Sequence, residues 1–160
     1  MTRSVFFFTY SFPPIGGVAA LRSLKFARYL TEFGWNVTVF HAGKGSTFAA
    51  DPDLLKEVPP EVRCIPVRTL EGAAVRRQLE KIKGGRFLIH RLLPLLPVDE
   101  RVGWVPGLIA AVRNEIDTQG SPDAIFSSAG PYSSNLAGLY FRSHRCRLRS
   151  RARRTGWARQ

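Results

Sequence analysis

The stretch that decides the fold is residues 5–40, VFFFTYSFPPIGGVAALRSLKFARYLTEFGWNVTVF. It begins with an unbroken apolar and aromatic run, Val5–Tyr10, which is typical of a strand buried on both faces of a parallel sheet. A loop with two adjacent glycines follows. Val18–Phe33 then has the amphipathic spacing of a helix, and Gly34 stands where a C-terminal cap is favoured. Trp35–Phe40 is rich in β-branched and aromatic residues, so the whole stretch predicts a βαβ unit with a right-handed crossover.

The same alternation continues along the chain. Two more strands are predicted, at Val62–Val67 and Ala124–Phe126. Further helices are predicted at Asp51–Val58, in two pieces within Glu71–Leu96, at Pro106–Asp117 and at Tyr132–Arg142. In the first helix, the apolar stripe expected to face the sheet is Leu21, Leu24, Ala27 and Leu30. Strands that alternate with helices indicate an α/β fold, a Rossmann-like parallel sheet flanked by helices.

Length and charge set the domain organisation. The 160 residues are 44% apolar and 22% charged, a mix that excludes a disordered chain or a fibrous repeat. The net charge of +12 is uneven, because residues 142–160 hold eight arginines and no acid, whereas residues 1–141 carry a net charge of +4. We therefore predict a Rossmann-like domain over residues 1–141 and a separate, largely disordered Arg-rich tail over residues 142–160.

The cysteine content and the apolar runs bear on location. Two cysteines, Cys64 and Cys146, are too few for a disulfide framework, and no apolar run is long enough to span a bilayer. These features predict a cytoplasmic protein. Residues 76–91 mix six Lys and Arg side chains with apolar ones, so this segment is either a helix with a solvated basic face or a peripheral contact with an anionic membrane surface.

The basic charge also raises a non-enzymatic alternative, a module that binds nucleic acid or an anionic membrane without catalysis. Nucleic acid is the less favoured partner, because the arginines gather in one tail and no recognisable reading motif is present.

Two loops at the carboxyl ends of predicted strands are candidates for ligand binding, since ligands of open parallel sheets bind there. Gly16 and Gly17 let backbone N–H groups approach an anion, and the helix that follows adds the positive end of its dipole. The second loop, Ser127–Asn135, offers hydroxyls and amides to a sugar or a phosphate. Simpler alternatives are a tight glycine turn in the first loop and serine N-capping in the second. The G-x-G-x-x-G dinucleotide fingerprint is absent.

The motifs of both loops resemble a known family. FPPIGG at residues 12–17, followed by Arg22 and by FARYL at residues 26–30, resembles the opening of glycosyltransferase family 4, the N-terminal half of a GT-B fold. GWNVTV at residues 34–39, GWVP at residues 103–106 and SSAGPYSS at residues 127–134 are similar to the same domain, so the likeness covers most of residues 4–141.

The resemblance implies transfer of a sugar from a nucleotide-sugar donor to an acceptor, which could be lipid-linked, with no metal and no other cofactor. In such enzymes the N-terminal domain mainly holds the acceptor, and its first glycine loop faces the donor diphosphate. The residues expected to bind ligand are Gly16, Gly17, Arg22, Ser127, Ser128, Ser133, Ser134 and Asn135.

The sequence also departs from the family pattern. No second Rossmann domain with a glutamate pair for the donor follows, so this chain alone is expected to be inactive. The likeness stops near Phe141, and a shifted reading frame would explain the tail. Read one base later, the codons for residues 145–151 can encode Gly-Val-Ala-Phe-Val-Ala, which is an apolar strand. The alternative is a genuine basic arm that binds phosphate or anionic lipid.

Four isolated features have simple structural explanations. His41, after the second predicted strand, is a weak catalytic candidate, and a partly buried polar residue is the simpler interpretation. The D-x-D sequence at residues 51–53 could bind a metal, but a helix N-cap at Asp51 explains it better. Cys64 is predicted to be a small core residue and Trp104 a packing anchor. No metal site is predicted.

Overall fold

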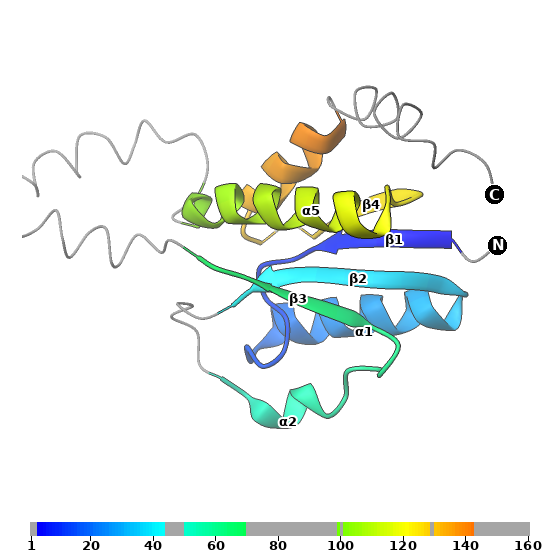
Figure 1. Cartoon of the computed structure of the whole chain (residues 1–160). Helices are drawn as coiled ribbons and strands as arrows, with labels where there is room; N and C mark the ends of the chain where they lie inside the picture. The colour runs from blue at the N-terminus through cyan, green and yellow to red at the C-terminus, as the bar shows by residue number, and fades with distance from the viewer. Residues whose placement is uncertain (1–2, 44–49, 70–98, 100, 129, 143–160) are drawn as a thin grey trace, which may run out of the picture.

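The computed structural model describes residues 3–43, 50–69, 99, 101–128 and 130–142. These residues form a four-stranded parallel sheet flanked by helices (Figure 1), which confirms the predicted α/β, Rossmann-like fold. The strands are β1 (Arg3–Phe8), β2 (Trp35–Ala42), β3 (Arg63–Val67) and β4 (Ala124–Ser127), in the order β3-β2-β1-β4. The described helices are α1 (Val18–Glu32), α2 (Pro52–Leu55), the 3-10 turn η2 (Val102–Trp104), α5 (Val105–Gln119) and a helix over residues 133–142.

β1 occupies an inner position because both of its faces are apolar. Successive side chains point to opposite faces of a strand. Phe7 stacks on Phe126 of β4, with 4.9 Å between ring centroids, whereas Phe6 meets Phe40 of β2 edge-on at 5.2 Å, on the other face. Aromatic pairs of this kind stabilise a sheet beyond the area that they bury. The apolar run that starts the sequence therefore links three neighbouring strands.

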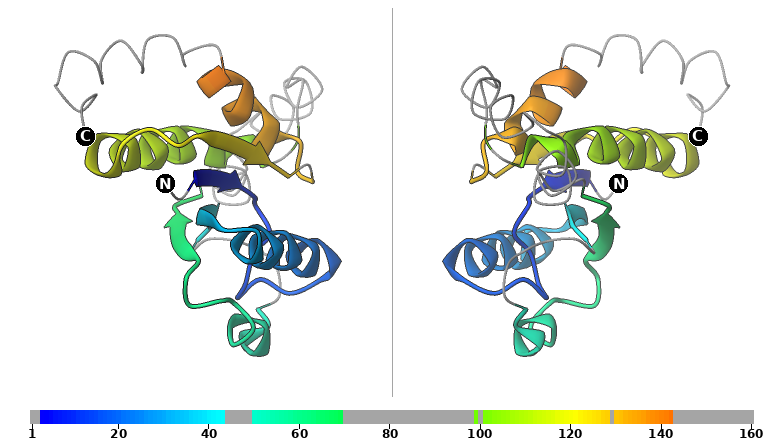
Figure 2. Two further views of the ribbon diagram at one scale, coloured as in Figure 1. Left: turned by 90° about the vertical axis from the view of Figure 1, so that its right-hand side faces the viewer. Right: turned by 90° about the vertical axis from the view of Figure 1, so that its left-hand side faces the viewer.

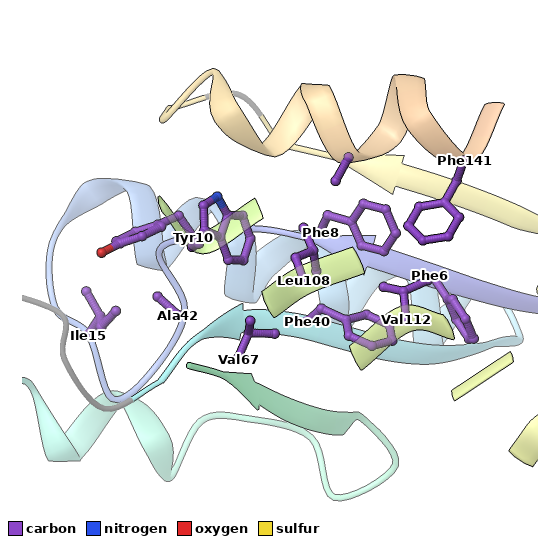
Figure 3. Close-up of a cluster of buried hydrophobic side chains, with 12 residues drawn as sticks. Phe6, Phe8, Tyr10, Ile15, Phe40, Ala42, Val67, Leu108, Val112 and Phe141 are labelled. Carbon is purple, nitrogen blue, oxygen red and sulfur yellow. The ribbon is translucent and has the colours of Figure 1, made fainter. Parts of the chain in front are cut away.

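Each face of the sheet has its own core. α1 covers one face, and α5 and the 133–142 helix cover the other, as the end-on views in Figure 2 show. The core under α1 comprises Val5, Phe7, Phe12, Leu24, Ala27, Val37, Val39 and Val62. The opposite core includes Phe6, Phe8, Tyr10, Phe40, Leu108, Val112 and Phe141 (Figure 3). This two-sided burial is what a parallel sheet requires.

The sheet-facing side of α1 differs from its predicted stripe. Leu24 and Ala27 are buried as expected, but Leu21 is 38% exposed. The buried positions on α1 are Ala20, Ser23, Leu24 and Ala27. Ser23 belongs to this side because its hydroxyl lies 2.8 Å from that of Thr9, just beyond β1. The buried side of α1 therefore includes a polar contact beside its apolar residues.

Several predicted boundaries shift by a few residues. β2 runs two residues beyond the predicted end at Phe40, because the N–H of Ala42 still donates to the carbonyl of Tyr10 at 3.1 Å. α2 is a single turn, and Asp51 caps it as predicted, accepting a hydrogen bond from the N–H of Asp53 at 3.2 Å. The helical pieces predicted within Glu71–Leu96, the basic segment 76–91 and the tail beyond Arg142 lie outside the described residues.

Two isolated expectations have opposite outcomes. Trp104 is 1% exposed and meets Tyr10 edge-on at 5.4 Å, which confirms the packing anchor. Cys64 is exposed, so its predicted place in the core is wrong. The reason is topological: β3 is an edge strand, and three of its five residues face solvent. Of the helices that the structure describes, none has the length and apolar character needed to cross a bilayer.

Candidate functional site

The first and fourth strands end side by side, so their loops meet at the carboxyl edge of the sheet. The β1–β4 pairing continues one residue past β4, where the N–H of Ser128 donates to the carbonyl of Phe8 at 2.9 Å. Arg22, one turn into α1, then reaches across and donates from Nη2 to Oγ of Ser128 at 3.4 Å. The structure thus brings together two predicted site residues that are 106 positions apart.

The glycine loop ends at the amino terminus of α1. Gly17 is the N-cap residue, with φ 100° and ψ 170°, a backbone region that is essentially restricted to glycine. No side chain caps this end of α1 among the described residues, and its first turn contains no acid. The positive end of the helix dipole is therefore not offset by a local carboxylate. A Cβ at Gly17 would have nothing within 4 Å, so the peptide surface here is open.

The loop after β4 contributes a second glycine beside the same arginine. Gly130 has φ 99°, and a Cβ placed on it would lie 3.8 Å from Nη2 of Arg22. Gly17 and Gly130 are both exposed, and Gly16 is half-buried. The arrangement combines backbone without side chains, a helix amino terminus and a guanidinium. This combination suits an anion such as a phosphate or diphosphate.

The remaining predicted residues lie on the helix side of β4. The hydroxyl of Ser127 donates to Oδ1 of Asn135 at 2.9 Å, and both side chains line a groove of about 620 Å³. Ser133 is fully buried, and its Oγ accepts a hydrogen bond from Nε1 of Trp104 at 3.2 Å. Ser134 is also fully buried, and no described residue hydrogen-bonds to its hydroxyl. The structure therefore groups Gly17, Arg22 and Ser128. Four other candidate residues, Ser127, Ser133, Ser134 and Asn135, lie apart from this group.

Asp99 connects two segments near the candidate site, and the sequence analysis did not identify it. Its carboxylate accepts the N–H of Arg101 through Oδ1 at 2.9 Å and the N–H of Ser133 through Oδ2 at 2.9 Å. It thereby joins η2 to the amino terminus of the 133–142 helix. The only signal in the sequence is its position two residues before Arg101, the spacing of an Asx turn.

Arg101 adds a second cation at the carboxyl edge of the sheet. Its Nη1 donates to the hydroxyl of Tyr10 at 3.2 Å, and its guanidinium carbon lies 5.2 Å from the centre of the same ring. A cation over an aromatic face is favourable, so Tyr10 both binds and orients this arginine. The carboxyl edge is therefore basic on the α1 side, through Arg22, and on the α5 side, through Arg101.

The sequence analysis placed His41 after the second strand, but the residue lies inside β2. Its side chain is buried against Phe12 of the first loop, with 5.5 Å between ring centroids. Burial lowers the pKa of His41 below 6.5, although its backbone hydrogen bond acts in the opposite direction. Nδ1 donates to the carbonyl of Ala42 at 3.0 Å, which leaves the lone pair on Nε2. The residue is therefore a neutral imidazole at pH 7.

Metal ligation has no site in the part of the chain that the structure describes, where no three His, Cys, Asp or Glu side chains cluster suitably. In the D-x-D sequence, Asp51 caps α2 and Asp53 accepts a hydrogen bond from Lys56 at 2.7 Å. Both carboxylates thus have local partners.

Comparison with protein-family models, with curated proteins and with solved structures found no match to this chain.

Proposed function

We propose that this chain is the N-terminal, acceptor-side half of a GT-B-type glycosyltransferase, which moves a sugar from a nucleotide-sugar donor to an acceptor. The observation that supports it best is the contact between Arg22 and Ser128 beside Gly17. It gathers residues of both family-like motifs at the carboxyl edge of a parallel sheet, where ligands of such sheets bind.

The chemistry of sugar transfer gives this group a role. When the bond between the sugar and the nucleotide breaks, negative charge develops on the leaving diphosphate. The open amino terminus of α1 and the permanent charge of Arg22 are both suited to stabilise that charge. Ser128 holds the guanidinium toward the loop, so the cation is oriented before a ligand arrives. No metal is needed for this step.

The proposal assigns one half of the catalytic arrangement to these 160 residues. Catalysis requires donor and acceptor to be held in line, and residues 1–141 are proposed to form the acceptor side of that arrangement. The acceptor could be lipid-linked, which would give the basic segment 76–91 a membrane to contact. That segment lies outside the described residues, so the membrane contact stays a prediction.

A nuclear magnetic resonance titration of the ¹⁵N-labelled full chain tests the proposed diphosphate site. Inorganic pyrophosphate and a uridine diphosphate sugar serve as probes. We expect the amide shifts to concentrate at Gly17–Arg22 and at Ser128–Gly130. Arg22→Gln should weaken pyrophosphate binding about tenfold, because it removes the charged donor. Arg28→Gln, a matched change on the exposed side of the same helix, should leave binding unchanged.

Two results would contradict the proposal. One is a set of shifts confined to residues 142–160, which would mean that the Arg-rich tail binds the anion unspecifically. The other is equal binding by the Arg22→Gln and Arg28→Gln variants, which would show that the group around Gly17 takes no part.

A further inference from the structure

The two edges of the sheet have opposite characters. β3, at one edge, contains Arg63 and Pro66, and both are exposed. Charges and prolines are the usual means by which an edge strand avoids pairing with another chain. β4, at the other edge, is Ala-Ile-Phe-Ser, with neither a charge nor a proline. β3 is thus protected as an edge, and β4 has the composition of an inner strand.

The groove that Ser127 and Asn135 line also runs along the helix side of β4, and most of its lining is apolar. It measures about 620 Å³ and lies between the end of α5, β4 and the 133–142 helix. Ile125 and Leu139 are lining residues that remain 37% and 58% exposed. Ile116 and Phe141 line the same groove. The groove therefore places exposed apolar side chains beside the edge of β4 that pairs with no other described strand.

The opposite face of β4 is also apolar and incompletely covered. Phe126 meets Phe26 of α1 edge-on at 5.4 Å, and Phe26 is still 43% exposed. Apolar side chains therefore flank the open edge on both sides. A strand placed there would bury Ile125 and Leu139 on one face and Phe26 on the other, so it would itself need apolar residues on both faces.

The position of the 133–142 helix indicates where a further strand of this sheet would lie. α5 and this helix lie on the face opposite α1. The crossover from β1 through α1 to β2 runs one way across the sheet, so a right-handed crossover on the other face runs the opposite way. A strand that follows the 133–142 helix would therefore lie beyond β4 and parallel to it.

From these observations we propose that the outer edge of β4, which pairs with no further strand among the described residues, is a docking edge for a parallel, apolar β-strand supplied by a second polypeptide. The residues that follow in this chain do not have the required chemistry, because positions 145, 147, 149, 151 and 153 are all arginine. In a strand these arginines would share one face. A partner strand with apolar side chains on both faces fills the groove and covers Phe26. This inference does not depend on the proposed enzymatic function.

Peptide binding to the full chain tests the docking edge. The probe is a fluorescent synthetic peptide, Gly-Val-Ala-Phe-Val-Ala with two lysines at each end for solubility, and anisotropy measures its binding. We expect saturable micromolar binding and slower hydrogen exchange at the amides of β4. Ile125→Lys should weaken binding at least about tenfold, because it puts a charge into the apolar groove. Leu139→Lys, on the helix side of the groove, should act in the same direction.

The matched control is Cys64→Lys, which adds the same charge at an exposed position of the other edge and should leave binding unchanged. A peptide with proline in place of its central alanine should not bind, because it cannot pair as a strand. Circular dichroism confirms that each variant is folded. If the peptide fails to bind to the full chain, the proposal is overturned. This holds whether residues of the same chain or a second copy of the chain occupy the edge. Unchanged binding by Ile125→Lys would overturn it as well.

Discussion

Arg63 of β3 and Glu115 of α5 form an ion pair with 3.1 Å between Nη2 and Oε2. The side chain of Glu115 is 5% exposed, whereas that of Arg63 is 53% exposed. A carboxylate inside a core is unfavourable unless it is paired. This pair therefore holds α5 over the outer part of the sheet, at the end of the helix away from the candidate site.

The first prediction concerns that pair. Arg63→Met should lower the free energy of unfolding by about 1–3 kcal/mol, because the buried carboxylate loses its cation. Arg28→Met breaks a pair in which both side chains are exposed, at 63% and 51%. That control should cost less than about 0.5 kcal/mol. Urea unfolding followed by circular dichroism measures both, and equal losses would show that burial of Glu115 does not matter.

The second prediction separates strain from ligand contact at Gly17. Gly120 ends α5 with φ 91° and ψ 174°, close to the values at Gly17, and a Cβ at either position has nothing within 4 Å. Alanine at each position should therefore cost a similar amount, about 1–3 kcal/mol, from backbone strain alone. Pyrophosphate binding should fall only for Gly17→Ala. If both variants bind pyrophosphate like the unmodified chain, the first loop is only a turn.

The third prediction is a pH dependence that arises from His41. Burial lowers the pKa of folded His41, whereas the unfolded chain keeps the ordinary value of 6.5. Above pH 6.5 the imidazole is neutral in both states and adds no pH dependence. As the pH falls below 6.5, the unfolded state takes up a proton that the folded state does not, so stability decreases.

His41→Asn should reduce this loss of stability, because asparagine does not titrate and its amide can replace Nδ1 as a donor to Ala42. Urea unfolding at neutral and mildly acidic pH measures how the free energy of unfolding changes with pH in the unmodified chain and in the variant. The ring proton resonances of His41 give its pKa directly. A measured pKa above 6.5 would contradict the prediction.

The fourth prediction concerns the carboxylate that joins η2 to the 133–142 helix. Asp99→Ala removes two hydrogen bonds to backbone N–H groups and should destabilise the fold by about 1–3 kcal/mol. Asp51→Ala removes the single cap of the one-turn helix α2 and should cost about 0.5 kcal/mol. Thermal unfolding compares the two variants, and the ranking would be disproved if Asp51→Ala were the more damaging.

The fifth prediction is that the purified chain transfers no sugar. The proposal gives the 160-residue chain only the acceptor side of the arrangement that would hold donor and acceptor in line. Radiolabelled nucleotide sugars and a panel of lipid and sugar acceptors provide the assay. Robust transfer by the monomeric chain would refute the proposed half-enzyme. Transfer that requires a separately expressed donor-binding domain would support it.

The sheet could be predicted because its strands carry their own signal. An inner parallel strand must be apolar on both faces, and Val5–Phe8 meets that requirement without reference to the rest of the chain, whereas Trp35–Phe40 is indicated by its β-branched and aromatic residues. Edge position leaves a weaker signal, which is why Cys64 was misplaced. The residue pattern of β3 does not reveal that Cys64 is left exposed at the edge of the sheet.

The side-chain contacts of the site were less predictable because their partners are far apart in sequence. Arg22 and Ser128 were each expected at a ligand, but nothing in the sequence indicates that they contact one another across 106 positions. Ser133 was expected to bind ligand because it lies in a serine-rich loop, yet its hydroxyl is buried and hydrogen-bonded to Trp104. Which side chains contact one another depends on how the helices pack on the sheet, and no local sequence pattern determines that packing.

The strand order has a consequence for synthesis on the ribosome. β1 can pair with β2 soon after both emerge, and α1 can then cover one face. The other neighbour of β1 arrives much later, since Ser4 and Asp123 at their paired ends are 119 positions apart. At about 5–20 residues per second, that gap is roughly 6–24 s of translation. Until α5 and β4 emerge, Phe6 and Phe8 lack the described residues of α5 that cover them in the finished fold, so one aromatic face of the early sheet has to wait for the later part of the chain.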